Sequence, residues 1–283
     1  MAYETLSIST GDIFRSSLRY IEKLLEGFKK NGAITTKITN GGGRSELNIA
    51  FDGVNTAMLA KLIETVQDAV ADIVITDCKC HYIESTLKLP IEDEISRHAF
   101  IRALSGFDRA ADKTIASTLI NLTPNFLLDS FYTFSLDPLK ARWQEVCALA
   151  NDNACFLVCD GTFRELLRFL ISNLESREPE VHLFQREDGV EVLTRALKPV
   201  NVYVSDELPA DAQVVSKLIS IAPKRIVLHR HCEAQSDGVC HSEPHGYTEV
   251  RNLSRPTDMT ERTCHVIDFI QNLFGSCVQV VQN

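Results

Sequence analysis

The chain has 283 residues, of which 45% are hydrophobic and 24% charged, so it can bury a substantial core as one large domain or two smaller ones. Its formal net charge of −9 argues against nucleic-acid binding through a broad basic surface, because neutralising phosphates requires clustered lysine and arginine. The N-terminus lacks the features of a signal peptide, and no segment approaches the roughly 20 apolar residues that span a bilayer. We therefore expect a cytoplasmic protein without membrane contact, whose nine cysteines are free, buried or metal-bound rather than paired.

The N-terminal region is expected to have the order α-β-β-α. Hydrophobic residues recur at helical spacing over residues 12–28. Two short strands follow at residues 33–39 and 45–51, and the glycine-rich sequence NGGGR between them is typical of a hairpin turn. A second helical pattern runs from Leu59 to Val74. Two further helical stretches are predicted around residues 91–104 and 109–120.

The second half begins near residue 119 and alternates helices with strands. Asp137 is a natural N-cap with Pro138 at the first helical position, which predicts a helix start there. Asp160 and Gly161 are expected to interrupt the helical pattern, and the capping box Thr162–Glu165 starts the next helix. A hairpin is then predicted from EVHLF and GVEVL across the turn QREDG, with VNVYV as a possible third strand.

The C-terminal segment predicts a βαβ unit. A helix over residues 211–221 leads into the strand RIVLH, and a helix over residues 261–274, closed by Gly275, leads into the final strand CVQVV. The long irregular segment between them leaves the carboxyl end of the first strand, where ligands of open sheets usually bind. We therefore predict an α+β fold, helix-rich with a small mixed sheet and a C-terminal βαβ unit. The expected division is an N-terminal α+β region, 1–118, and a C-terminal α/β region, 119–283.

Common catalytic motifs are absent from the sequence. GGGRS lacks the lysine and spacing of a phosphate-binding P-loop and is better explained as a hairpin turn. VCDGT resembles a phosphatase motif, but Val158 stands where that chemistry needs a nucleophilic aspartate. Cys78, Cys80 and His81 in CKCH form a metal-like fragment, although three ligands so close in sequence can rarely all reach one ion.

The segment HRHCEAQSDGVCHSEPH is the strongest candidate metal site. Continuing the strand RIVLH would place the first two histidines on the same face, because side chains alternate along a strand. A tetrahedral zinc site needs four nitrogen or sulfur ligands, and this segment offers more than enough. Its spacing matches no standard zinc finger, so a structural loop and a catalytic histidine or cysteine remain alternatives. The candidate ligands are His229, His231, Cys232, Cys240 and His245.

Three stretches of the second half resemble the YtxC-like sporulation proteins of endospore-forming bacteria. These are FLISNLESREPEVHLF, VVSKLISIAPKRIVLH and FIQNLFGSCVQVV, which follow the order of corresponding features in that family. The resemblance runs from about residue 119 to residue 281. The sequence departs from the family pattern in its long segment after His229 and in having Cys277 in place of a cysteine-rich tail. The resemblance implies a role in sporulation, but no enzymatic activity, cofactor or site residue.

The first functional hypothesis is therefore a cytoplasmic, sporulation-associated protein that is non-enzymatic, needs no cofactor and acts through contacts with an unidentified protein partner. The alternative is a zinc-binding protein or zinc-dependent enzyme that uses the histidine and cysteine cluster. Nucleic-acid binding through Lys224, Arg225 and Arg230 is a third possibility, which the acidic total charge disfavours.

Overall fold

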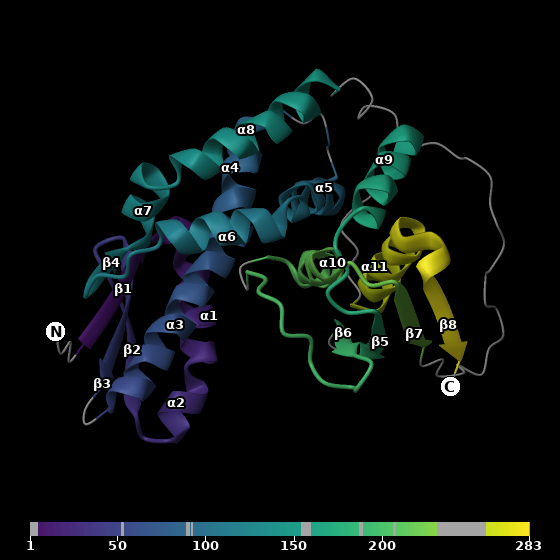
Figure 1. Ribbon diagram of the computed structural model, residues 1–283. Helices are drawn as coiled ribbons and strands as arrows, with labels where there is room; N and C mark the ends of the chain where they lie inside the picture. The colour runs from purple at the N-terminus through teal and green to yellow at the C-terminus, as the bar shows by residue number, and fades with distance from the viewer. Residues whose placement is uncertain are drawn as a thin grey trace.

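The computed structural model describes residues 5–51, 54–88, 91, 93–153, 160–186, 189–205, 208–230 and 259–282. The fold is α+β, as predicted, and it contains two small mixed sheets of four strands each, which lie at opposite sides of a helical layer (Figure 1). The strand order is β2-β3-β1-β4 in the N-terminal sheet and β6-β5-β7-β8 in the C-terminal sheet.

The N-terminal sheet is built around a hairpin and a strand that the sequence pattern did not reveal. The predicted hairpin is confirmed, and Gly42 and Gly43 at its turn have φ angles of 60° and 75°, which favour glycine. The additional strand runs through TLSISTG, where only Leu6 and Ile8 alternate with small polar residues. The four strands are β1 (Thr5–Gly11), β2 (Ile34–Gly41), β3 (Arg44–Phe51) and β4 (Asn125–Leu127).

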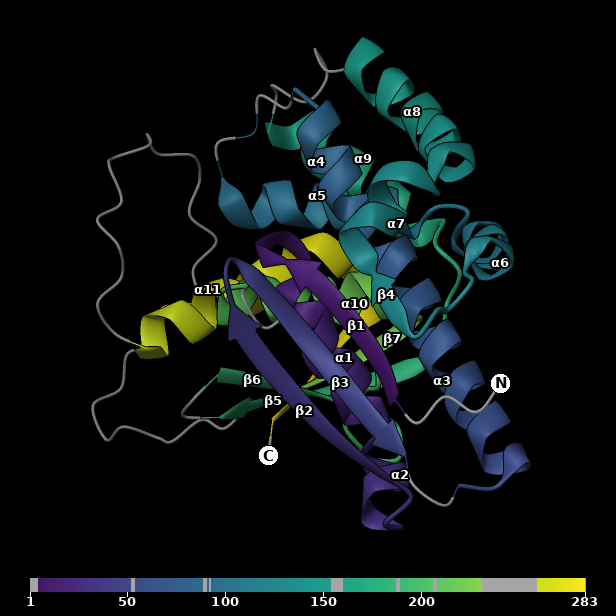
Figure 2. The same cartoon turned by 90° about the vertical axis from the view of Figure 1, so that its left-hand side faces the viewer.

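One face of this sheet is covered by helices, which lie behind the strands in Figure 2. The predicted helix over residues 12–28 is divided into a 3-10 turn, η1 (Asp12–Phe14), and two helices, α1 (Arg15–Leu24) and α2 (Glu26–Lys30). The next helix, α3 (Thr56–Ile73), begins where the Asn55 side chain accepts a hydrogen bond from the backbone N–H of Met58 at 2.9 Å.

Helix α3 continues without a break through the π-helical turn η2 (Val74–Cys78) into α4 (Lys79–Thr86). The helices described in the middle of the chain are α5 (Glu94–Gly106), α6 (Arg109–Leu119), α7 (Leu128–Phe134), α8 (Asp137–Asp152) and α9 (Asp160–Ser172).

Two predicted helix starts differ from the structure. The N-cap of α8 is Leu136, not Asp137. Asp137 instead lies in the first turn, where its negative charge interacts favourably with the positive end of the helix dipole. Helix α9 already begins at Asp160, so the expected interruption at Asp160 and Gly161 is not present. Both differences amount to a shift of one or two residues in a boundary.

The C-terminal sheet confirms the predicted hairpin and the βαβ unit. Strands β7 and β8 are parallel neighbours, with Ile226 opposite Val278, and α11 connects them. Gly275 follows α11 with a φ angle of 49°, as expected of a glycine that ends a helix. The elements are β5 (Glu180–Arg186), β6 (Gly189–Thr194), α10 (Ala210–Ile221), β7 (Arg225–Arg230), α11 (Met259–Phe274), η4 (Gly275–Cys277) and β8 (Val278–Gln282).

The possible third strand at VNVYV is not part of the sheet. An isolated bridge joins β6 to the residue just before this segment, between Leu193 and Pro199, and the Val200 N–H donates to the Val192 carbonyl at 3.4 Å. The carbonyl of Tyr203 instead accepts a hydrogen bond from the Arg102 side chain at 2.8 Å. A tertiary contact therefore uses a backbone group that a sheet would otherwise have paired.

Two hydrophobic cores underlie the two sheets. The first includes Ile8, Leu47 and Val70, and the second includes Val181, Leu218 and Ile226, all fully buried or nearly so. Strand β4 lies after residue 118 but belongs to the N-terminal sheet. Helix α5 lies before residue 118 but contributes to the second core. The cores thus interleave along the chain, and the division at residue 118 remains a prediction.

A buried ion pair joins α4, α6 and α8 beside these cores. Lys79 Nζ lies 2.7 Å from Asp112 Oδ2, and both side chains are 1% exposed. Lys79 also donates to the carbonyl of Phe107 at 2.6 Å, while Trp143 Nε1 and Arg142 Nε donate to Asp112 at 2.9 and 3.1 Å. Each charge is therefore compensated by its partner and by further hydrogen bonds, as a buried pair requires.

Replacing Asp112 by asparagine should lower the free energy of unfolding by about 3–5 kcal/mol, because the Lys79 charge would remain buried without a counter-ion. Urea unfolding monitored by circular dichroism would measure this loss. The matched control is Glu84→Gln, which breaks the half-exposed Arg97–Glu84 ion pair and should cost less than about 1 kcal/mol. Equal losses in the two variants would contradict the role assigned to Asp112.

Candidate functional site

A half-open polar cleft lies where the N-terminal helices meet the segments that precede β5 and α10. It consists of two adjoining cavities of about 380 and 390 Å³. Asp72, Arg109 and Arg177 line both cavities, so they mark the centre of the cleft. A polar cleft of this size fits a small ligand or a side chain of a partner.

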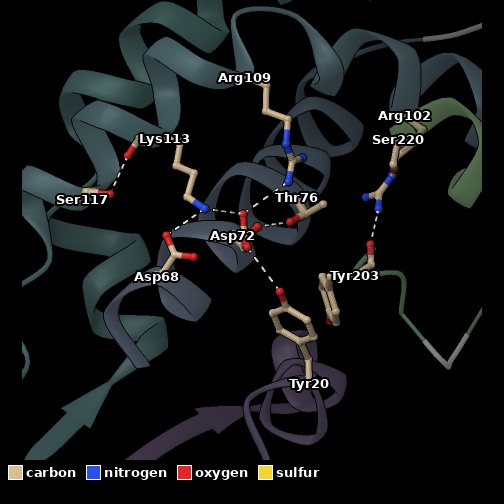
Figure 3. Close-up of polar contacts among 10 residues, drawn as sticks. All are labelled: Tyr20, Asp68, Asp72, Thr76, Arg102, Arg109, Lys113, Ser117, Tyr203 and Ser220. Carbon is tan, nitrogen blue, oxygen red and sulfur yellow. Dashed lines mark hydrogen bonds and ion pairs between the residues drawn. The ribbon is translucent and has the colours of Figure 1, made fainter. Parts of the chain in front are cut away.

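Asp72 is the centre of a hydrogen-bonded cluster in this cleft. Figure 3 shows Tyr20, Arg109 and Lys113 pointing toward its carboxylate. The distances are 3.3 Å from Tyr20 Oη, 3.4 Å from Arg109 Nη2 and 3.1 Å from Lys113 Nζ. Lys113 also pairs with Asp68 at 2.8 Å, which is possible because Asp68 and Asp72 are four residues apart on one face of α3.

The environment of this cluster shifts the pKa of its donors. Burial lowers the pKa of Arg109 to about 10, with a further contribution from the charge of Arg177, while Asp72 acts in the opposite direction. Burial also lowers the pKa of Lys113, but hydrogen bonds and attraction to Asp68 and Asp72 outweigh it, so the net pKa is raised. The pKa of Tyr20 is raised by burial and by Asp72. At neutral pH these side chains therefore stay protonated and act as hydrogen-bond donors.

A second polar network joins the two halves of the molecule beside the cleft. Arg102 on α5 donates from Nε to Ser220 Oγ at 2.9 Å and from Nη2 to the Tyr203 carbonyl at 2.8 Å. The Tyr203 hydroxyl in turn donates to Asp77 at 2.5 Å, and Ser17 donates to the same carboxylate oxygen at 2.9 Å. Burial, and then Asp77, raise the pKa of Tyr203, so its hydroxyl remains a donor.

The π-helical turn η2 explains how Asp77 reaches this network. A π turn inserts one residue into a helix and rotates the following side chains, and such turns are frequent at functional sites. Asp77 lies within η2, between the regular helices α3 and α4. Sequence periodicity does not reveal the turn, because residues 56–86 form an uninterrupted helical segment.

Of the five predicted metal ligands, only His229 lies within the described residues, since His231, Cys232, Cys240 and His245 lie outside them. The His229 ring stacks on Phe184 with centroids 4.2 Å apart, and its Nε2 lies 2.8 Å from His182 Nδ1. His229 Nδ1 is buried and has no hydrogen-bond partner among the described atoms. The histidine that was expected to bind metal thus forms part of an imidazole pair.

His182 is the residue that sequence reasoning missed. Its signal was the alternation of strand β5, which places Glu180, His182 and Phe184 on one face. Parallel pairing of β5 with β7 then puts Phe184 opposite His229 and brings His182 close to it. Glu180 Oε1 lies 3.5 Å from the other ring nitrogen of His182, which completes a row of three polar side chains.

The side chains of Cys78, Cys80 and His81 in the fragment CKCH lie in different environments. Cys78 is buried in the first hydrophobic core, where burial raises the pKa of its thiol, whereas Cys80 packs against the second core. The ring of His81 contacts Phe14 and Tyr132. Within the described ranges, no group of three or more His, Cys, Asp or Glu side chains is arranged to hold a metal ion.

The basic sequence around β7 is partly compensated by other side chains. Arg225 donates to Glu180 at 2.8 Å and to Gln279 at 2.6 Å. Lys224 is exposed, beside the beginning of the strand. Among the described helices, none has both the length and the hydrophobicity needed to cross a bilayer.

Comparisons with protein-family models, with curated proteins and with solved structures found no match to this chain.

The imidazole pair predicts a pH dependence of stability. Burial and the nearby His182 lower the pKa of His229 below its ordinary 6.5, so the folded state binds a proton at this ring less readily than the unfolded state does. Its contribution to stability is therefore present above pH 6.5 and is lost as the pH falls toward the lower, folded-state pKa.

We expect His229 to titrate below pH 6.5 in a proton NMR titration and His182→Gln to move its midpoint upward. Urea unfolding at pH 7.5 and at about pH 5, near the acid end of the histidine range, would measure the free energy of unfolding. We expect it to fall more between pH 7.5 and about pH 5 in the wild-type protein than in His229→Gln. Identical losses in these two proteins would contradict the prediction.

Proposed function

We propose that this protein is a cytoplasmic, sporulation-associated protein that acts by binding a protein partner rather than by catalysis. The observation that carries the proposal is the position of the three sequence segments that resemble YtxC-like proteins. They are separated along the chain, yet they contain β5, β7 and β8, which are adjacent and parallel in one sheet (Figure 1). The resemblance therefore covers one continuous structural unit.

The chemistry of the cleft supports a binding role. Tyr20 and Tyr203 have raised pKa values and stay protonated, and their hydroxyls donate to Asp72 and Asp77, so neither is a base or a nucleophile at neutral pH. Lys113 is engaged by Asp68 and Asp72 on a helix that is part of the first core. These contacts hold the walls of the cleft in place, and a fixed polar cleft suits recognition of a polar group, because little conformational entropy is lost on binding.

If the proposal holds, deletion of the gene in its source organism should reduce the number of heat-resistant spores without slowing vegetative growth. Wild-type protein should restore spore formation, and so should Glu191→Asp at an exposed position of β6. Val181→Asp should not, because it buries an unpaired carboxylate in the core of the resembling unit and lowers protein abundance several-fold. An unchanged spore count in the deletion strain would contradict the proposed role.

Zinc binding is the second candidate function, favoured by the His182–His229 pair. The two facing ring nitrogens lie 2.8 Å apart, and a metal ion would have to replace the hydrogen bond that now joins them. These two imidazoles would supply half of a tetrahedral site.

Elemental analysis of purified, untagged protein distinguishes the two candidates. The main proposal predicts clearly substoichiometric zinc. About one zinc per chain, reduced in both His182→Gln and His229→Gln, would favour the zinc-binding alternative.

A further inference from the structure

Charge is unevenly distributed between the two cavities of the cleft. The cavity beside Tyr20 and Tyr203 is balanced, with three basic and three acidic residues: Lys61, Arg109, Arg177, Glu64, Asp68 and Asp72. The adjoining cavity has an excess of positive charge, with four basic and two acidic residues: Arg102, Arg109, Lys113, Arg177, Asp72 and Glu175. The second cavity therefore favours an anion, although the whole chain is acidic.

Arg102 carries the least compensated charge in this cavity. Its side chain is only 8% exposed, yet its closest hydrogen-bond acceptors, Ser220 Oγ and the Tyr203 carbonyl, are neutral. No carboxylate of the described ranges forms an ion pair with it. A buried guanidinium without a counter-ion is costly, so an anion bound nearby would be stabilised strongly.

Arg177 adds a second positive charge that is available to a ligand. Its backbone N–H is fixed by a hydrogen bond of 2.8 Å to the Ile221 carbonyl, whereas its side chain is exposed at the cleft. After burial, the charges of Arg177 and Arg102 also lower the pKa of Arg109, as expected of guanidiniums that each repel the Arg109 charge. Asp72 offsets this repulsion only in part, because Lys113 and Tyr20 also interact with it.

We propose that the positively charged cavity is a binding site for a small phosphate-bearing anion, held by Arg109 and Arg177 and stabilised by the buried charge of Arg102. Guanidinium groups match the geometry of phosphate oxygens and can donate two parallel hydrogen bonds to them. A volume of about 390 Å³ accommodates either free phosphate or a small phosphate monoester. Neutralisation by the ligand would relieve the repulsion that Arg102 and Arg177 exert on Arg109.

Isothermal titration of the purified full-length protein at constant ionic strength would test this site. The probes are inorganic phosphate, glycerol phosphate as a small monoester, and malonate as a dicarboxylate. We expect saturable binding of at least one phosphate probe, and the tighter of the two identifies the form of phosphate that the site prefers. Saturation by malonate alone, or by none of the three, would overturn the proposal.

Arg177→Ala should weaken phosphate binding by about 10-fold or more, because a hydrogen bond to a charged group is lost. The matched control is Arg44→Ala, which removes the same charge from an exposed position on the β2–β3 hairpin and should bind phosphate as wild type does. Arg109→Lys keeps the charge but removes the fork of donors, so it should bind with intermediate affinity. Equal affinities of Arg177→Ala and Arg44→Ala would place the anion elsewhere. This test uses purified protein and is independent of the sporulation phenotype.

Discussion

The connection from Arg102 through Tyr203 to Asp77 determines how the two halves of this protein meet. It joins α5, the segment before α10 and the π turn η2 in one hydrogen-bonded path. Arg102 and Tyr203 are both buried, so water does not compete for these hydrogen bonds. The path fixes one wall of the cleft, where the Tyr203 ring packs against Tyr20, a member of the cluster around Asp72.

Burial of charge is the common physical theme of the molecule. The Lys79–Asp112 pair is fully compensated and stabilises the packing of three helices. Arg102, in contrast, is buried without an ion-pair partner among the described residues, so the free-energy cost of burying its charge must be offset by the surrounding structure or by a ligand. The difference between a compensated and an uncompensated buried charge separates a structural role from a candidate binding role.

Of the side chains at the candidate sites, His229 is predictable from the sequence, whereas His182 and the cluster around Asp72 are not. His229 can be predicted because it lies near the end of a recognisable apolar strand and begins an unusual run of histidines and cysteines. Its partner His182 cannot be predicted in this way, since the two residues are 47 positions apart and meet through the parallel pairing of β5 with β7. The cluster around Asp72 gave no motif at all, because Tyr20, Asp72 and Arg109 come from three separate helices.

The sequence alone determined the α+β class, both hairpins and the C-terminal βαβ unit, because these features depend on local periodicity, glycine turns and helix caps. Tertiary structure decided the central strand β1, the π turn at Asp77 and the loss of the possible strand at VNVYV. It also decided which buried charges have a counter-ion among the described residues, as Lys79 does and Arg102 does not. Those outcomes depend on the free energy of contacts between distant segments, which local propensity does not contain.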